Sequence, residues 1–98
     1  MKIIWLPGAI FDLKRLKEFL ATLDKGAAQK AVVTIKRSVA LLEQYDSLGK
    51  PVADLPDFRD VIIPFGSAGY VLRYRIRNEV VVIVAVRHAK EAGFVTLK

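Results

Sequence analysis

The strongest constraint on the fold is an uninterrupted run of seven apolar residues, Val80–Val86, which ends abruptly at Arg87 and His88. Because it lacks polar alternation, such a run is typical of a strand with both faces covered. We therefore predict that it forms the central strand of a sheet. It is far shorter than the roughly 20 apolar residues of a membrane-spanning helix, so we expect no membrane association and a cytoplasmic protein. The 98 residues allow one hydrophobic core, which predicts a single domain over 1–98.

Two amphipathic helices precede this run. A short apolar stretch over residues 2–6 predicts a strand, and from Ala9 the apolar residues recur every three or four positions. We expect this first helix to end near Asp24, with Gly26 in a left-handed cap. A second apolar stripe runs from Ala28 to Leu42, and the short connection predicts an antiparallel helical hairpin. The polar face of the first helix carries Asp12, Lys14, Arg15, Lys17 and Glu18.

The second half of the chain reads as strands. Residues 59–65 predict one strand, Gly66–Gly69 a turn, and the alternating stretch Tyr70–Arg77 a half-buried strand. Asn78-Glu79 then fits a two-residue hairpin turn into the apolar run. The predicted fold class is α+β in two layers, β-α-α-β-β-β, with the helical hairpin packed on a small antiparallel sheet.

Additional apolar residues flank the main helical stripes. A stripe this wide usually indicates burial on two sides, so we favour the core for these residues, with a partner surface as the alternative. They are Phe11, Phe19, Val33, Leu41 and Tyr45.

The chain is basic, with 16 Lys and Arg against 10 Asp and Glu. This favours an acidic or polyanionic partner, although a well-solvated basic protein fits equally. Arg73, Arg75 and Arg77 share one face of a strand at a spacing of roughly 6.6 Å, which favours a binding surface. The alternative is neutralisation by nearby carboxylates, namely Asp57, Asp60, Glu79 or Glu91.

Few residues are available for catalysis or metal binding. Cysteine is absent and His88 is the only histidine, so we expect neither a metal nor a cofactor. Histidine suits proton transfer near neutrality, but a strand end often places such a residue at the surface without chemistry. We disfavour a catalytic role for His88.

Three motifs carry a resemblance to a known family. They are GKPV at residues 49–52, GYVLRY at 69–74 and RHAKE at 87–91. With these motifs, nearly the whole chain resembles the RelE/ParE superfamily of toxins from bacterial type II toxin-antitoxin modules. The resemblance implies the element order predicted above. It also implies a hetero-oligomer with a cognate antitoxin that has an acidic or amphipathic tail.

The superfamily has two branches with different implied activities. Members similar to RelE cut messenger RNA in the ribosome, using basic residues where this chain carries Ile62, Pro64, Val71 and, in the last segment, Glu91 or a neighbour. Members similar to ParE are implied to poison DNA gyrase by binding, and the RHAKE ending is closer to that branch. We therefore expect a noncatalytic gyrase inhibitor, with a ribosome-dependent endoribonuclease as the alternative. A basic binding domain unrelated to toxicity is the third hypothesis.

Two surfaces are expected for these partners, and no residue is assigned a catalytic role. The target-binding candidates are Arg87, His88, Lys90, Glu91 and Phe94. The antitoxin-binding candidates are Arg73, Arg75, Arg77, Phe11 and Phe19.

Overall fold

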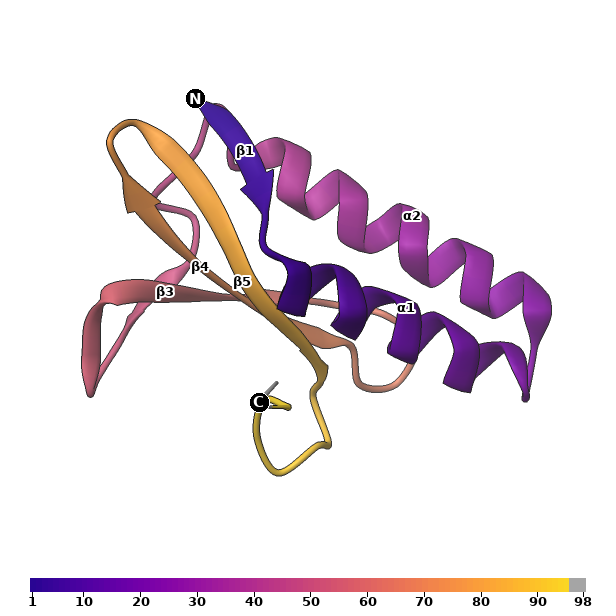
Figure 1. Ribbon diagram of the computed structural model, residues 1–98. Helices are drawn as coiled ribbons and strands as arrows, with labels where there is room; N and C mark the ends of the chain where they lie inside the picture. Colours follow the sequence, from indigo (N-terminus) through magenta and orange to yellow (C-terminus); the bar gives the residue numbers. More distant parts are fainter. Residues whose placement is uncertain (96–98) are drawn as a thin grey trace.

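A helical hairpin packs on one face of a twisted sheet (Figure 1). The computed structural model describes residues 1–95, which form two helices and a five-stranded sheet of order β1-β5-β4-β3-β2. The elements are β1 (Lys2–Trp5), α1 (Pro7–Ala21), α2 (Lys25–Leu41), β2 (Lys50–Val52), β3 (Leu55–Ile63), β4 (Tyr70–Arg77) and β5 (Val80–His88). The predicted α+β class and its two layers are confirmed.

The sheet differs from the prediction in two respects. It is mixed rather than antiparallel, because β1 pairs with β5 in parallel, from Lys2 opposite Val80 to Trp5 opposite Ile83. It also contains β2, a strand that was not predicted and that pairs antiparallel with β3. β2 has only three residues, one of them a proline, and its register with β3 shifts after Pro51. Such a short and irregular strand gives no periodicity signal. As a result β4 is the middle strand, and β5 lies between β4 and β1.

The apolar run in β5 has a different origin from the one predicted. Val81, Ile83 and Val86 are fully buried, whereas Val82 and Val84 are only half-buried. Arg73 of β4 pairs with Ala85 and the next residue, Tyr74, pairs with Ile83, which leaves Val84 as the extra residue of a β-bulge. The bulge shifts the alternation by one position. The run therefore reflects this phase change and a partly open apolar face, and the expectation that both faces are covered was wrong.

The boundary between the helices was also predicted wrongly. α1 begins at Pro7 and ends at Ala21, and α2 begins almost immediately afterwards. Asp24 is the N-cap of α2, because its carboxylate accepts a hydrogen bond from the Ala27 N–H at 3.0 Å. Gly26 consequently lies in the first turn of α2 and is not a left-handed cap.

The helices bury their main stripes but not the flanking residues. In α2 and its C-cap, the predicted core positions are buried, namely Ala28, Ala31, Ile35, Val39 and Leu42. By contrast, Phe11 is 44% exposed and Phe19 is 67% exposed. The prediction that the flanking residues belong to the core was wrong, because they lie outside the helical faces that pack on the sheet and on the other helix. Val33, Leu41 and Tyr45 are exposed as well.

Both predicted turns are present, and both use left-handed backbone conformations. Asn78 and Glu79 have φ values of 51° and 61°, as a type I′ hairpin requires, although neither is glycine. Gly66 and Gly69 have positive φ values in the turn between β3 and β4. β3 ends at Ile63, directly before the proline that cannot continue the ladder.

Two of the three motifs meet inside the molecule. The buried Tyr74 hydroxyl donates to the Asp46 carbonyl at 2.6 Å and accepts from the Gly49 N–H at 2.9 Å. A Cβ at position 49 would lie 2.7 Å from the tyrosine ring, so only glycine fits there. A Cβ at Gly69 would collide with the Ile63 carbonyl oxygen. The GKPV and GYVLRY motifs therefore maintain the fold.

Within residues 1–95, neither helix combines the length and the hydropathy that crossing a bilayer requires.

Candidate functional site

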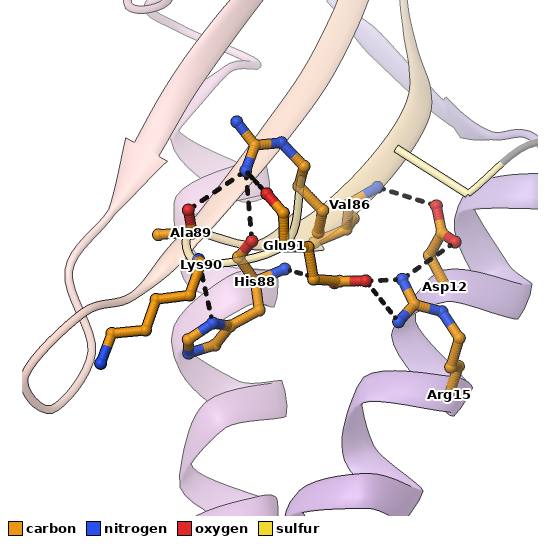
Figure 2. Close-up of polar contacts among 8 residues, drawn as sticks. Asp12, Arg15, Val86, His88, Ala89, Lys90 and Glu91 are labelled. Carbon is orange, nitrogen blue, oxygen red and sulfur yellow. Dashed lines mark hydrogen bonds and ion pairs between the residues drawn. The ribbon is translucent and has the colours of Figure 1, made fainter. Parts of the chain in front are cut away.

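The third motif forms a turn at the end of β5, which we call the C-terminal turn (Arg87–Glu91). The Arg87 side chain holds this turn together, because Nη1 donates to the carbonyl oxygens of His88, Ala89 and Glu91 at 3.2, 3.3 and 3.1 Å (Figure 2). The same guanidinium lies 5.2 Å from the ring centroid of Phe94. Arg87 and Phe94 were expected to contact a target, but here Arg87 contacts the turn and Phe94, and the Phe94 ring also lies 4.5 Å from the Arg73 guanidinium.

The imidazole of His88 is oriented by the backbone. Its Nδ1 accepts a hydrogen bond from the Lys90 N–H at 3.1 Å, which places the proton of a neutral ring on Nε2. The ring meets Tyr70 edge-on, with centroids 5.6 Å apart and an interplanar angle of 89°. Burial raises the pKa of the Tyr70 phenol, so this neighbour stays neutral. Since no carboxylate among residues 1–95 forms a hydrogen bond or ion pair with the imidazole, the arrangement favours a binding surface over a general base.

The carboxylate of Glu91 joins the C-terminal turn to α1. It accepts from the His88 N–H at 2.8 Å and faces the Arg15 guanidinium, with contacts of 3.1 and 3.4 Å. Arg15 also lies 3.5 Å from the Asp12 carboxylate one turn earlier in α1. We call this set the Asp12–Arg15–Glu91 bridge (Figure 2).

Asp12 is the charged residue whose location was predicted wrongly. It was assigned to the polar face of the helix, but it is 2% exposed and accepts from the Val86 N–H at 3.0 Å. Burial raises the pKa of this carboxyl above its usual value of 3.8, whereas the hydrogen bond from Val86 and the charge of Arg15 oppose the increase. Its spacing of three residues from Arg15 was a sequence signal for an ion pair, but not for burial.

A cavity of about 580 Å³ separates α1 from the C-terminal turn. One wall consists of apolar side chains of α1 and of the connection after it, including Leu16, Leu20 and Leu23, and the loop over residues 65–68 contributes another. The remaining polar part of the lining includes Arg15, His88, Lys90 and Glu91. The cavity is thus mainly apolar, with charged groups from two distant parts of the chain, as is usual for binding sites.

The arginine row, which consists of Arg73, Arg75 and Arg77 of β4, lies away from the cavity. Because Tyr70, Leu72 and Tyr74 face the core, the alternating arginines of β4 lie on the opposite side of the sheet from the helices. Arg73 binds Asp60 through two hydrogen bonds of 2.8 and 3.0 Å, and this contact raises the pKa of Arg73. The neutralisation alternative is therefore confirmed for Arg73.

The other two arginines differ from Arg73. Arg75 lies over the Phe58 ring at 5.2 Å, and Arg77 is exposed. They do not form one surface with Phe11 and Phe19, which belong to the opposite layer. A partner that contacts both sets of antitoxin-binding candidates must pass around an edge of the sheet.

The positions at which the nuclease branch carries basic residues differ in their exposure to solvent in this structure. Ile62 is 71% exposed, Pro64 is exposed and Val71 is buried. Across residues 1–95, no three His, Cys, Asp or Glu side chains gather in a way that could hold a metal ion.

Comparisons with known proteins agree on one family. The family described as ParE toxin of type II toxin-antitoxin system, parDE, matches residues 3–93. Toxin RelE3 of Caulobacter vibrioides is 34% identical over 85 residues, which cover 87% of this chain and 90% of the relative. Toxin RelE1 of the same organism is 31% identical over 80 residues, covering 82% and 84%.

A solved structure confirms the fold. The structure titled Chromosomal ParDE TA system from P. aeruginosa superposes with a TM-score of 0.77, covering 92% of this chain and 97% of that one. At 22% sequence identity, this likeness concerns the arrangement of the elements.

Proposed function

Because the chain belongs to the ParE toxin family of type II toxin-antitoxin systems, we propose that it inhibits DNA gyrase by binding, without catalysis. In this proposal it acts in the cytoplasm, and a cognate antitoxin neutralises it in a hetero-oligomer. The membership of the family makes it a toxin, and the choice of gyrase as the target is the proposal.

One observation carries the choice of binding over catalysis. The two charged ends of the RHAKE motif, Arg87 and Glu91, are engaged within the molecule, where they hold the C-terminal turn. A ribonuclease needs an acid, a base and cations aimed at the phosphate. The turn instead presents His88 and Lys90 beside a mainly apolar cavity, which supports recognition of a protein surface.

The surface of α1 supports an antitoxin partner. Phe11 and Phe19 of α1 are 44% and 67% exposed, and Leu23, in the connection that follows α1, is 72% exposed. A row of exposed large apolar residues on a helix fits the apolar face of an amphipathic segment. The net charge of +6 favours a segment that is acidic on its other face.

An endoribonuclease of the RelE type is the second candidate. The observation in its favour is that the curated relatives carry the name RelE. Against it, two of the positions that would bear basic residues carry an exposed isoleucine and a buried valine, Ile62 and Val71.

The test compares both activities with one preparation. We expect the purified protein to inhibit DNA supercoiling by gyrase and to leave messenger RNA intact on translating ribosomes. Lys90→Glu should weaken the inhibition by about tenfold, whereas the matched change Lys36→Glu, on the exposed side of α2, should not. His88→Ala should retain part of the inhibition, because no proton transfer is involved. Codon-specific cleavage of messenger RNA that His88→Ala abolishes would favour the second candidate.

A further inference from the structure

We propose that Arg15 is a positioning residue: through the Asp12–Arg15–Glu91 bridge it fixes the C-terminal turn against α1 and so sets the shape of the cavity between them. For its effect on gyrase binding, this inference rests on the function proposed above. The bridge joins residues 76 positions apart in the chain, and none of its members touches a target in this role.

Each carboxylate of the bridge has a second partner, and Arg15 is the group that they share. Asp12 also accepts from the Val86 N–H, and Glu91 also accepts from the His88 N–H. The two ends of the bridge are therefore fixed to the backbone on either side of Arg87. Arg15 links them, and so links α1 to the backbone that presents His88.

The bridge is more constrained than a surface ion pair. The side chains of Arg15 and Glu91 are 27% and 29% exposed, and the side chain of Asp12 is 3% exposed. Without Arg15, the Asp12 carboxylate would be buried without a counter-charge, which is unfavourable. The planar guanidinium presents donors in several directions and can face both carboxylates, whereas a lysine ammonium is a single point charge. We therefore expect Arg15→Lys to restore the function only in part.

The cavity depends directly on this geometry. Arg15 and Glu91 belong to its lining, between the apolar residues of α1 on one side and His88 and Lys90 on the other. If the link is broken, the turn is free to shift relative to α1, and the two walls lose their fixed separation. Binding through the cavity then also has to order the turn, and this ordering lowers the affinity.

The experiment begins with the free protein, so that it does not depend on gyrase. We would measure amide hydrogen exchange of His88 and the ¹⁵N shift of its Nδ1 in Arg15→Gln and in Glu91→Gln. Exchange at His88 should accelerate about tenfold or more in both variants, and the Nδ1 shift should move as its contact with Lys90 loosens. Lys17→Gln, an exposed change on the same helix, is the matched control and should alter neither value.

Gyrase inhibition is then measured with the same proteins. Each single variant should weaken inhibition about tenfold, and Arg15→Gln combined with Glu91→Gln should weaken it no further, because both remove one link. If Arg15→Gln fails to fold, Glu91→Gln still tests the link, because it leaves the Asp12–Arg15 pair intact. The charge swap Arg15→Glu with Glu91→Arg would place two carboxylates beside each other in α1 and is not a suitable rescue.

Each outcome decides a separate point. Unchanged exchange at His88 in both variants overturns the positioning role. Accelerated exchange with undiminished gyrase inhibition shows that the turn is not the surface that binds gyrase, and it overturns the proposed effect of Arg15 on inhibition. If the unmodified protein does not inhibit gyrase, the proposed function fails, and the exchange data alone decide whether Arg15 positions the turn.

Discussion

At the scale of single residues, polar groups with several partners explain most of what the motifs do. The Tyr74 hydroxyl ties β4 to the segment before β2, and the Asp12 carboxylate ties α1 to the end of β5. Both groups are fully buried. A buried polar group that keeps its hydrogen bonds specifies one arrangement of the chain, because every alternative leaves it unsatisfied.

Tyr74→Phe should lower the free energy of unfolding by about 1–3 kcal/mol. The change leaves the Gly49 N–H and the Asp46 carbonyl without their partner, and unsatisfied buried groups are costly. Urea unfolding at neutral pH measures the loss. Tyr45→Phe, at a position that is 59% exposed, is the control and should change stability by less than about 0.5 kcal/mol. Equal losses in the two variants would contradict the role of the Tyr74 hydroxyl.

The raised pKa of Asp12 predicts how one contribution to stability depends on pH. Because the folded-state pKa lies above the unfolded value of 3.8, the folded state binds more protons in the window between the two values. The contribution of Asp12 is therefore fully present below pH 3.8 and is lost as the pH rises through the folded pKa.

Asp12→Asn isolates this contribution. The unfolding free energy of the unmodified protein minus that of the variant should fall as the pH rises through this window, and should then level off. Urea unfolding at a series of pH values measures the difference. A difference that increases with pH would show that the contacts with Arg15 and Val86 outweigh burial.

At the scale of elements, the β-bulge in β5 decides which side chains enter the core. Val84 is the extra residue, so Ile83 and Val86 both face the helices although they are three positions apart. The bulge also brings the Val86 N–H to Asp12. A strand without it would place the next core residue at position 85 and would reverse the faces of His88 and its neighbours.

Ile83→Ala should lower the free energy of unfolding by about 2–5 kcal/mol, because it removes fully buried methyl groups from the core. Thermal or urea unfolding gives the value. The alternation itself is tested by a matched pair on the same strand: Val81→Ala, at a fully buried position, should cost more than Val82→Ala, at a half-buried one. A smaller effect at Val81 would mean that the faces of β5 are assigned the wrong way round.

At the scale of the whole molecule, the candidate partner surfaces lie in three places. Exposed aromatic residues lie on α1, the cavity lies between α1 and the C-terminal turn, and the remaining arginines lie on the far face of the sheet. The first two adjoin each other, because Phe19 also lines the cavity. A segment bound along α1 therefore comes close to His88 and Lys90, whereas the arginines require a different part of the partner.

Two variants should separate the apolar and electrostatic parts of antitoxin binding. Phe19→Ser should weaken binding of the cognate antitoxin without changing its salt dependence, because it removes only apolar contact. Arg75→Gln with Arg77→Gln should flatten the dependence of affinity on salt, since screening acts on charges. Calorimetric titrations between about 50 and about 300 mM salt measure both. An unchanged salt dependence in the second variant would make the arginines a solvated face.

Local patterns determined every element except β2, whereas the tertiary structure determined how the elements meet. Apolar periodicity predicted both helices and the bounds of β4, since these depend on neighbours in sequence. The RHAKE motif lies at the end of β5, and the structure shows how its arginine and glutamate build a turn there. The parallel pairing of β1, the bulge at Val84, the burial of Asp12 and the contact between Arg15 and Glu91 could not be predicted. Each of these depends on packing between segments far apart in the chain. The face of α1 with Asp12 and Arg15 looks polar in the sequence, but β5 supplies an N–H for Asp12 and the C-terminal turn supplies a carboxylate for Arg15.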